Sequence, residues 1–167
     1  MRPAMVATIV LLGALASASA QQVLVGWEFD KDGDTEGWLP AHSLAPLVVE
    51  GGVLKTSVTN SDPYMHSAAG QSFDLQGNDF QYLEIRMRHS VGTGAEFFWA
   101  NTIEGKDAGF VAGKERGFAC VPGDEWHVYR LYPMWQGQVT RLRLDPPEGE
   151  DGVVEIDYLR IIQMLAD

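Results

Sequence analysis

The sequence has very little cysteine and few basic residues, and both shortages narrow its possible functions. Cys120 is the one cysteine among 167 residues, so no internal disulfide can form, and zinc or redox sites built from several cysteines are excluded. We expect Cys120 to be buried as a small apolar side chain. Only 12 Lys and Arg stand against 23 Asp and Glu, for a formal net charge of −11. Nucleic acids and anionic membranes are recognised by basic faces, so neither is an expected partner.

Long apolar runs are also missing, apart from one near the start. Within residues 1–20, Arg2 near the start is followed by an apolar segment at residues 6–15, and the stretch ends in Ala18-Ser19-Ala20. This order is typical of a signal peptide, and the apolar segment is shorter than the ~20 residues of a membrane span. We therefore predict a secreted or periplasmic mature chain that starts near Gln21. Loss of the leader, which holds one Arg and no acid, would change the net charge from −11 to −12.

No segment shows the sustained 3.6-residue apolar period of an amphipathic helix. Apolar and polar residues instead alternate in short segments separated by Gly, Pro, Asn and Asp, which is the pattern of β-strands. The expected strands are residues 23–29, a hairpin of 47–49 and 53–58, then 81–89, 95–100, 110–111, 117–121, 126–132, 139–145 and 153–162, with a loop at 60–70. Many short strands without crossover helices predict an all-β fold, an antiparallel β-sandwich of the jelly-roll type. We predict one such domain over residues 21–167.

Four stretches, taken in order, resemble a known family. They are Trp27-Glu28-Phe29-Asp30 with Glu36-Gly37-Trp38, then Ser61-Asp62-Pro63-Tyr64, then Trp126-His127-Val128-Tyr129-Arg130, and finally residues 142–146 (LRLDP) with 155–161 (EIDYLRI). Together they resemble galactose-binding-like jelly rolls, which include many bacterial carbohydrate-binding modules. The resemblance implies a non-catalytic module that binds a polysaccharide or another glycan.

An acidic turn between the first two expected strands is a candidate calcium site. Asp30, Asp32 and Asp34 alternate with other residues there, and calcium takes six to eight oxygen ligands from a loop that can wrap it. In the resembling family a structural calcium often ties the first strand to the last, which implies that Asp30 and Asp157 share such an ion. The alternative is a solvated turn in which Asp and Gly simply form the bend.

The polar sides of two expected strands form the candidate ligand site. Tyr82, Arg86 and Arg88 share one side of residues 81–89, and Arg143 lies on residues 139–145, which we expect to join the same locally basic face. Aromatic rings can stack on sugars, and arginines can bond sugar hydroxyls or hold a uronate carboxylate by two hydrogen bonds. The predicted ligand-binding residues are Tyr82, Arg86, Arg88, Trp99, Trp135 and Arg143. The alternative, favoured by how common such pairs are, is a cross-strand ladder in which these arginines pair with Glu84, Asp145 and their neighbours.

The tryptophans allow both structural and binding roles. We expect Trp27, Trp38 and Trp126 to lie in or over the core. Trp135, in the loop of residues 133–137, is the best candidate for an exposed platform, although a loop tryptophan more often covers a core.

Catalytic motifs are missing from the sequence. No zinc-ligand spacing, nucleophile elbow or phosphate-binding loop is present, so we predict that the chain is not an enzyme. One enzymatic alternative is a jelly-roll polysaccharide lyase that uses Tyr82, Arg86, His89 and Arg141. Strand alternation opposes it, because His89 falls on the other side from Tyr82 and Arg86. A further alternative is a structural or adhesion module that binds another protein.

Overall fold

The computed structural model describes residues 21–67 and 75–165, and within them the chain is built almost entirely of β-strands. The predicted leader, residues 1–20, lies outside the described residues. No described helix is long and apolar enough to cross a membrane. The single helical element described is a short 3-10 turn, Lys106–Gly109.

The described strands form two large antiparallel sheets and a small pair. The six-stranded sheet has the order β10-β7-β13-β4-β3, and β1 also pairs with β13. The five-stranded sheet has the order β2-β5-β12-β8-β9, and β11 pairs with β6. The strands are β1 Gln21–Trp27, β2 Trp38–His42, β3 Val48–Val49, β4 Leu54–Ser57, β5 Tyr64–Ser67, β6 Leu75–Gly77, β7 Gln81–His89, β8 Gly94–Ala100, β9 Glu115–Ala119, β10 Gly123–Leu131, β11 Gly137–Val139, β12 Arg141–Asp145 and β13 Val153–Met164.

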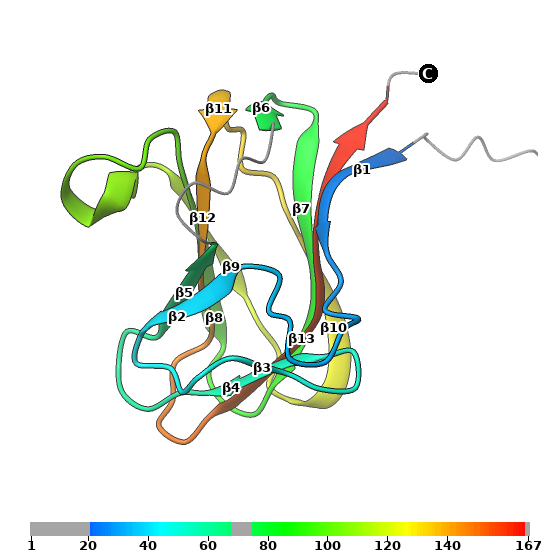
Figure 1. Ribbon diagram of the computed structural model, residues 1–167, viewed down its shortest axis with the longest axis vertical. Helices are drawn as coiled ribbons and strands as arrows, with labels where there is room; N and C mark the ends of the chain where they lie inside the picture. The colour runs from blue at the N-terminus through cyan, green and yellow to red at the C-terminus, as the bar shows by residue number, and fades with distance from the viewer. Residues whose placement is uncertain (1–20, 68–74, 166–167) are drawn as a thin grey trace, which may run out of the picture.

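The two large sheets face each other as a β-sandwich, which confirms the predicted fold class. Figure 1 shows β7, β13 and β1 on one side of the molecule and β12, β8 and β5 on the other, with β6 and β11 at one end. Strand alternation sends one set of side chains inward from each sheet. Leu83, Ile85 and Met87 of β7 and Leu142 and Leu144 of β12 are fully buried in the shared core.

The core also contains the residues expected there at the start of the chain. Trp27 and Trp38 are buried edge to face, with ring centroids 5.6 Å apart. Such aromatic pairs stabilise a core beyond the area they bury. Cys120 is buried as predicted, and burial raises the pKa of its thiol to about 12. At neutral pH this thiol is therefore protonated and unreactive.

Some expected elements differ from the structure. The segment 60–70, which we predicted to be a loop, contains β5. Only Met65 and Ser67 of this strand point inward, and so short an alternating pattern is hard to recognise beside Asp62-Pro63. Residues 110–111 are not a strand, because they follow the 3-10 turn, and the strand there is Glu115–Ala119. The first strand has a register shift between Val23 and Val25, which leaves Val23 half exposed instead of inward.

Candidate functional site

Four of the predicted ligand-binding residues lie on the outward sides of the two large sheets, three on one sheet and one on the other. Tyr82, Arg86 and Arg88 lie on β7 in the six-stranded sheet, whereas Arg143 lies on β12 in the five-stranded sheet. The expectation of one continuous basic face is therefore wrong. Its cause is pairing order, because β7 bonds to β10 and β13, and β12 bonds to β5 and β8.

The outward side of β10, β7 and β13, here called the ladder face, carries arginines that each pair with an acid. The side chain of Arg130 donates to Glu84 at 2.7 Å and that of Arg88 donates to Glu155 at 2.5 Å, in each case directly across the strand pair. Two further ion pairs on this side of the molecule are Arg86 with Asp157 and Arg160 with Glu28. The ladder interpretation is thus confirmed for this face.

The aromatic rings of the ladder face are covered by the same arginines. The guanidinium groups of Arg86 and Arg88 lie 5.0 and 4.8 Å from the ring centroid of Trp126. Trp126 is therefore half-buried under charged groups. The expectation that it lies in the core is wrong. Tyr82 is 2 % exposed, and its hydroxyl donates to Gln21 at 3.0 Å. Burial raises the pKa of the Tyr82 hydroxyl, and the ring offers no open surface for stacking.

The outward side of β5, β12, β8 and β9, here called the groove face, is organised around Arg143. Its guanidinium carbon lies 3.7 Å from the ring centroid of Tyr64 and 4.7 Å from that of Phe98. Arg143 donates two hydrogen bonds of 2.6 Å to the carboxylate of Asp145. This bidentate pair between two rings holds the side chain in one position.

Two hollows open on the groove face on either side of Glu96. The larger, of about 610 Å³, is lined by Asp62, Pro63, Gly92, Thr93, Gly94, Ala95, Glu96, Gly117, Phe118, Asp145, Pro146 and Glu148. The second, of about 360 Å³, is lined by Glu96, Phe98, Asp107, Phe110, Val111, Ala112, Glu115 and Arg143. Glu96 and the strands β8, β9 and β12 contribute to both, so the two hollows are neighbours on this sheet, and together they are treated as one groove. We call it the groove.

Glycines keep the larger hollow open at the sheet edge. A methyl group added at Gly94 would meet nothing within 4 Å, and one added at Gly117 would only touch neighbours at 4.0 Å. The segment that walls the second hollow depends on another glycine. Gly109 has a φ of +86°, and a side chain there would lie 2.0 Å from the carbonyl oxygen of Thr102. Because Gly109 has no side chain, the 3-10 segment can fold back beside the sheet.

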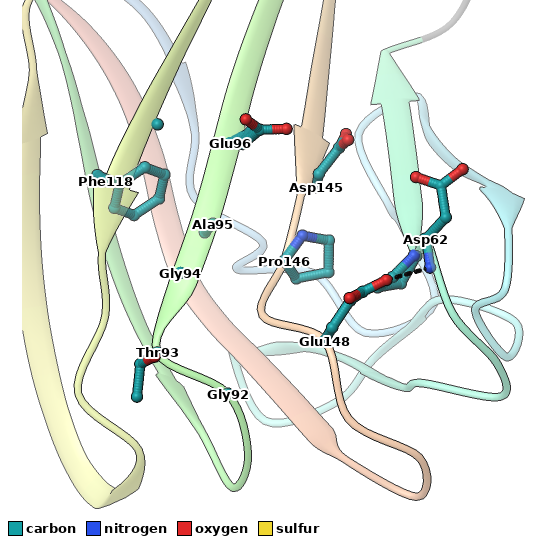
Figure 2. A pocket seen from close by; sticks show the side chains of 12 residues that line it. Asp62, Gly92, Thr93, Gly94, Ala95, Glu96, Phe118, Asp145, Pro146 and Glu148 are labelled. Carbon is teal, nitrogen blue, oxygen red and sulfur yellow. Dashed lines mark hydrogen bonds between the residues drawn. The ribbon is translucent and has the colours of Figure 1, made fainter.

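The groove is strongly acidic. Figure 2 shows the carboxylates of Glu96, Asp145 and Asp62 on β8, β12 and the segment before β5, around the larger hollow. Glu96 and Asp145 are directly opposite each other in the strand register. Burial raises the pKa of Asp145, and the charges of Asp62 and Glu96 raise it further, against the opposing effect of Arg143. The carboxylates of the groove lining thus outnumber its single arginine.

The remaining predicted platforms are buried, which corrects the expectation of exposed rings. Trp135 is 1 % exposed and Trp99 is 4 % exposed, and their rings meet edge to face at 6.0 Å. The indole N–H of Trp135 donates to the side chain of Gln81 at 2.6 Å. Trp135 therefore covers the end of the core, the role that loop tryptophans more often have.

The aromatic residues of the groove are Phe98, Phe110 and Phe118, none of which the sequence identified. One signal was available for Phe98. In Phe97-Phe98-Trp99, alternation must send one ring to the side opposite the other two, and Phe98 is that outward ring. Phe110 gives no such signal, because the 3-10 segment that places it has no period.

The residues of the lyase alternative are not brought together. His89 is buried and lies at the end of β7, where its Nδ1 donates to the carbonyl oxygen of Val91 at 2.8 Å. Arg141 lies on the other sheet, against His66 and Phe110. A base and an arginine on opposite sides of the core cannot act on one sugar ring.

Three of the four acids of the predicted calcium site have separate partners. Asp157 pairs with Arg86. Asp32 accepts a hydrogen bond from the backbone N–H of Gly51 at 2.8 Å, and Asp34 accepts one from that of Glu36 at 3.0 Å. Asp30 is exposed beside them. Within residues 21–67 and 75–165, no group of three or more His, Cys, Asp or Glu is placed to hold a metal.

Comparison with known proteins identifies the fold. No family model and no curated protein matches the sequence. A variant of the carbohydrate-binding module CBM29-2 in complex with cellulohexaose superposes with a TM-score of 0.53 and 14 % identity, over 86 % of this chain and 89 % of that one. The CBM22-1 xylan-binding domain of Paenibacillus barcinonensis Xyn10C has a TM-score of 0.56 and 16 % identity, over 90 % and 100 % of the chains.

A third neighbour is a CBM29-2 variant in complex with mannohexaose, with a TM-score of 0.52 and 13 % identity over 87 % of this chain and 92 % of that one. At these identities the likeness concerns the fold. It confirms the jelly-roll fold that the sequence indicated, a fold that these carbohydrate-binding modules share.

Proposed function

We propose that this chain is an exported, non-catalytic polysaccharide-binding module and that its glycan lies in the groove. The observation that carries the proposal is the groove itself, an open channel with aromatic rings and hydrogen-bond acceptors on the outward side of one sheet. The fold neighbours bind cellulohexaose, mannohexaose and xylan, which supports a polysaccharide as the ligand. One fold hosts many functions, so the second support for the proposal is the chemistry of the groove.

The groove residues suit the surface of a sugar chain. Phe98 and Phe110 line the second hollow, and the aliphatic C–H face of a sugar can pack on the half-buried, outward ring of Phe98. Phe118 contributes to the larger hollow, but its ring packs inward against the core and Tyr129. The carboxylates of Glu96 and Glu148 can each accept hydrogen bonds from sugar hydroxyls, and such bonds to charged acceptors are strong. No step of this binding requires a catalytic group.

Affinity gel electrophoresis tests the proposal. The mature protein is run through native gels that contain soluble β-glucan, mannan or xylan, with an unrelated acidic protein as the reference. We expect at least one polysaccharide to slow the protein relative to the reference. Equal mobility in all gels, followed by no signal on a glycan array, would contradict the proposal and favour the protein-binding alternative.

Export is part of the same proposal, and its support is the leader pattern of residues 1–20. Expression of the full chain in a bacterial host, followed by N-terminal sequencing of the exported protein, tests it. We expect the first residue to be Gln21. Retention of the uncleaved chain in the cytoplasm would contradict it.

A structural calcium at the acidic turn is a further part of the proposal. Its support is the spacing of Asp30, Asp32 and Asp34 in the sequence. Thermal melting in calcium and in chelator decides it, because an ion bound to the folded state raises the melting temperature. A higher midpoint in calcium supports the ion, and equal midpoints remove it from the account.

A further inference from the structure

The lining of the groove has a large excess of acid, and this excess bears on which glycan it binds, provided that the proposed function holds. Six carboxylates line the two hollows: Asp62, Glu96, Asp107, Glu115, Asp145 and Glu148. Arg143 is the one basic residue of that lining. The formal charge of the lining is therefore −6 + 1 = −5.

Arg143 is not available to neutralise an anionic ligand. Its Nε and Nη2 groups already donate to both oxygens of Asp145, and its faces lie against Tyr64 and Phe98. A uronate would have to displace Asp145 and leave that carboxylate buried without its partner, which is strongly unfavourable. The sequence-based idea that Arg143 clamps a uronate therefore fails on geometry.

Glu115 adds an acceptor that the protein leaves unused. Glu115 belongs to the lining of the second hollow, and its Oε2 atom is buried with no hydrogen-bond partner among the described residues. A buried carboxylate oxygen without a donor is costly to the fold unless a bound molecule or water supplies one. It lies in the same lining as Glu96 and Asp107, so a donor with positive charge is the partner that this hollow favours.

We infer that the groove selects glycans by charge: it binds polymers that carry free amino groups more tightly than neutral ones, and it excludes polyuronates. A protonated amine gives each carboxylate a charged hydrogen-bond donor, whereas its acetylated form gives a neutral donor. A uronate meets only repulsion. One such charge contact at ~4 Å is worth about a fivefold change in affinity even at the dielectric constant of water.

Matched pairs of ligands test this inference by isothermal titration calorimetry. The first pair is glucosamine hexamer and N-acetylglucosamine hexamer, which share a backbone and differ in charge. The second is methyl-esterified pectin and the same polymer after de-esterification. At pH 6 and low salt we expect the amine form to bind at least fivefold tighter than the acetylated form, and the de-esterified pectin not to bind. Added salt should reduce the amine advantage.

Two variants that each remove one negative charge test whether the preference for amines arises in the groove. Glu115→Gln should reduce the preference for the amine form several-fold, whereas Glu125→Gln, at an exposed position on β10, should leave it unchanged. Equal binding of both hexamers, or an equal effect of both variants, overturns the charge selection while leaving the proposed function in place. Absence of binding to these ligands and to every neutral glycan overturns both.

Discussion

The ladder face and the groove face contain the same residue types, but the first is a covered surface and the second has open hollows. Both place guanidinium groups over aromatic rings and carboxylates on neighbouring strands. On the ladder face the four arginines meet four acids, and their side chains cover Trp126. In the lining of the groove one arginine faces six acids, and two hollows stay open between them. Cross-strand balance of charge, and not the number of arginines, therefore separates a closed face from an open one.

Replacing an arginine on each face should reveal the largest difference between the two faces, measured as the loss of unfolding free energy. Arg143→Ala leaves Asp145 partly buried without its bidentate partner, and we expect a loss of about 3 kcal/mol of unfolding free energy. Arg88→Ala breaks a more exposed pair and should cost clearly less. Denaturant unfolding of both variants measures this. Similar losses would mean that the two faces do not differ in this way.

Filling the larger hollow should abolish binding without harming the fold. Gly117→Leu places a side chain in open space at a position without a left-handed backbone, so the melting temperature should stay near that of the parent protein. We expect the affinity for the best glycan to fall at least tenfold, by steric exclusion. Arg86→Ala, on the ladder face, is the matched control and should bind normally. The reverse pattern would move the site to the ladder face.

Removal of one ring from each face should give a smaller contrast. Phe98→Ala takes an aromatic surface from the second hollow, and stacking contacts of this kind are worth about 1 kcal/mol or more. We expect a roughly fivefold weaker affinity by calorimetry. Trp126→Ala, under the ladder arginines, should leave the affinity unchanged even if it lowers stability. A binding loss confined to Trp126→Ala would contradict the assignment.

Acid should weaken the fold through two histidines. Burial lowers the pKa of His89, as does the nearby His127, and burial together with the charge of Arg141 lowers that of His66. The folded state therefore binds fewer protons than the unfolded one. The stabilising contribution of the two neutral histidines is present above their ordinary pKa of 6.5 and is lost as the pH falls below that value.

Melting temperatures between pH 7.5 and pH 5 check this dependence, which we expect to be the smallest of these effects. Replacement of His89 by Phe should flatten the profile. A midpoint that rises as the pH falls would show that the raised pKa of Asp145 dominates instead, because that group favours folding at low pH.

The sequence predicted the fold and missed the site for physical reasons. Strand alternation is local, so residues 81–89 could be recognised in full, and the alternative of a ladder in which arginines pair with Glu84 and its neighbours followed from the same alternation. Which strands share a sheet depends on long-range pairing that a single sequence does not encode locally, so Arg86 and Arg143 could not be separated. The wall that contributes Phe110 comes from a segment without periodicity. Glycines that keep a hollow open leave no positive signal at all.

The central claim is that the glycan lies on the groove face. Amide chemical-shift changes in a ¹⁵N-labelled protein, titrated with the glycan that slows it most in gels, test this most directly. We predict that the changes cluster at Gly94, Glu96 and Gly117, on the strands that line the groove. Changes that cluster instead at Arg86, Arg88 and Trp126, on the ladder face, would contradict the account.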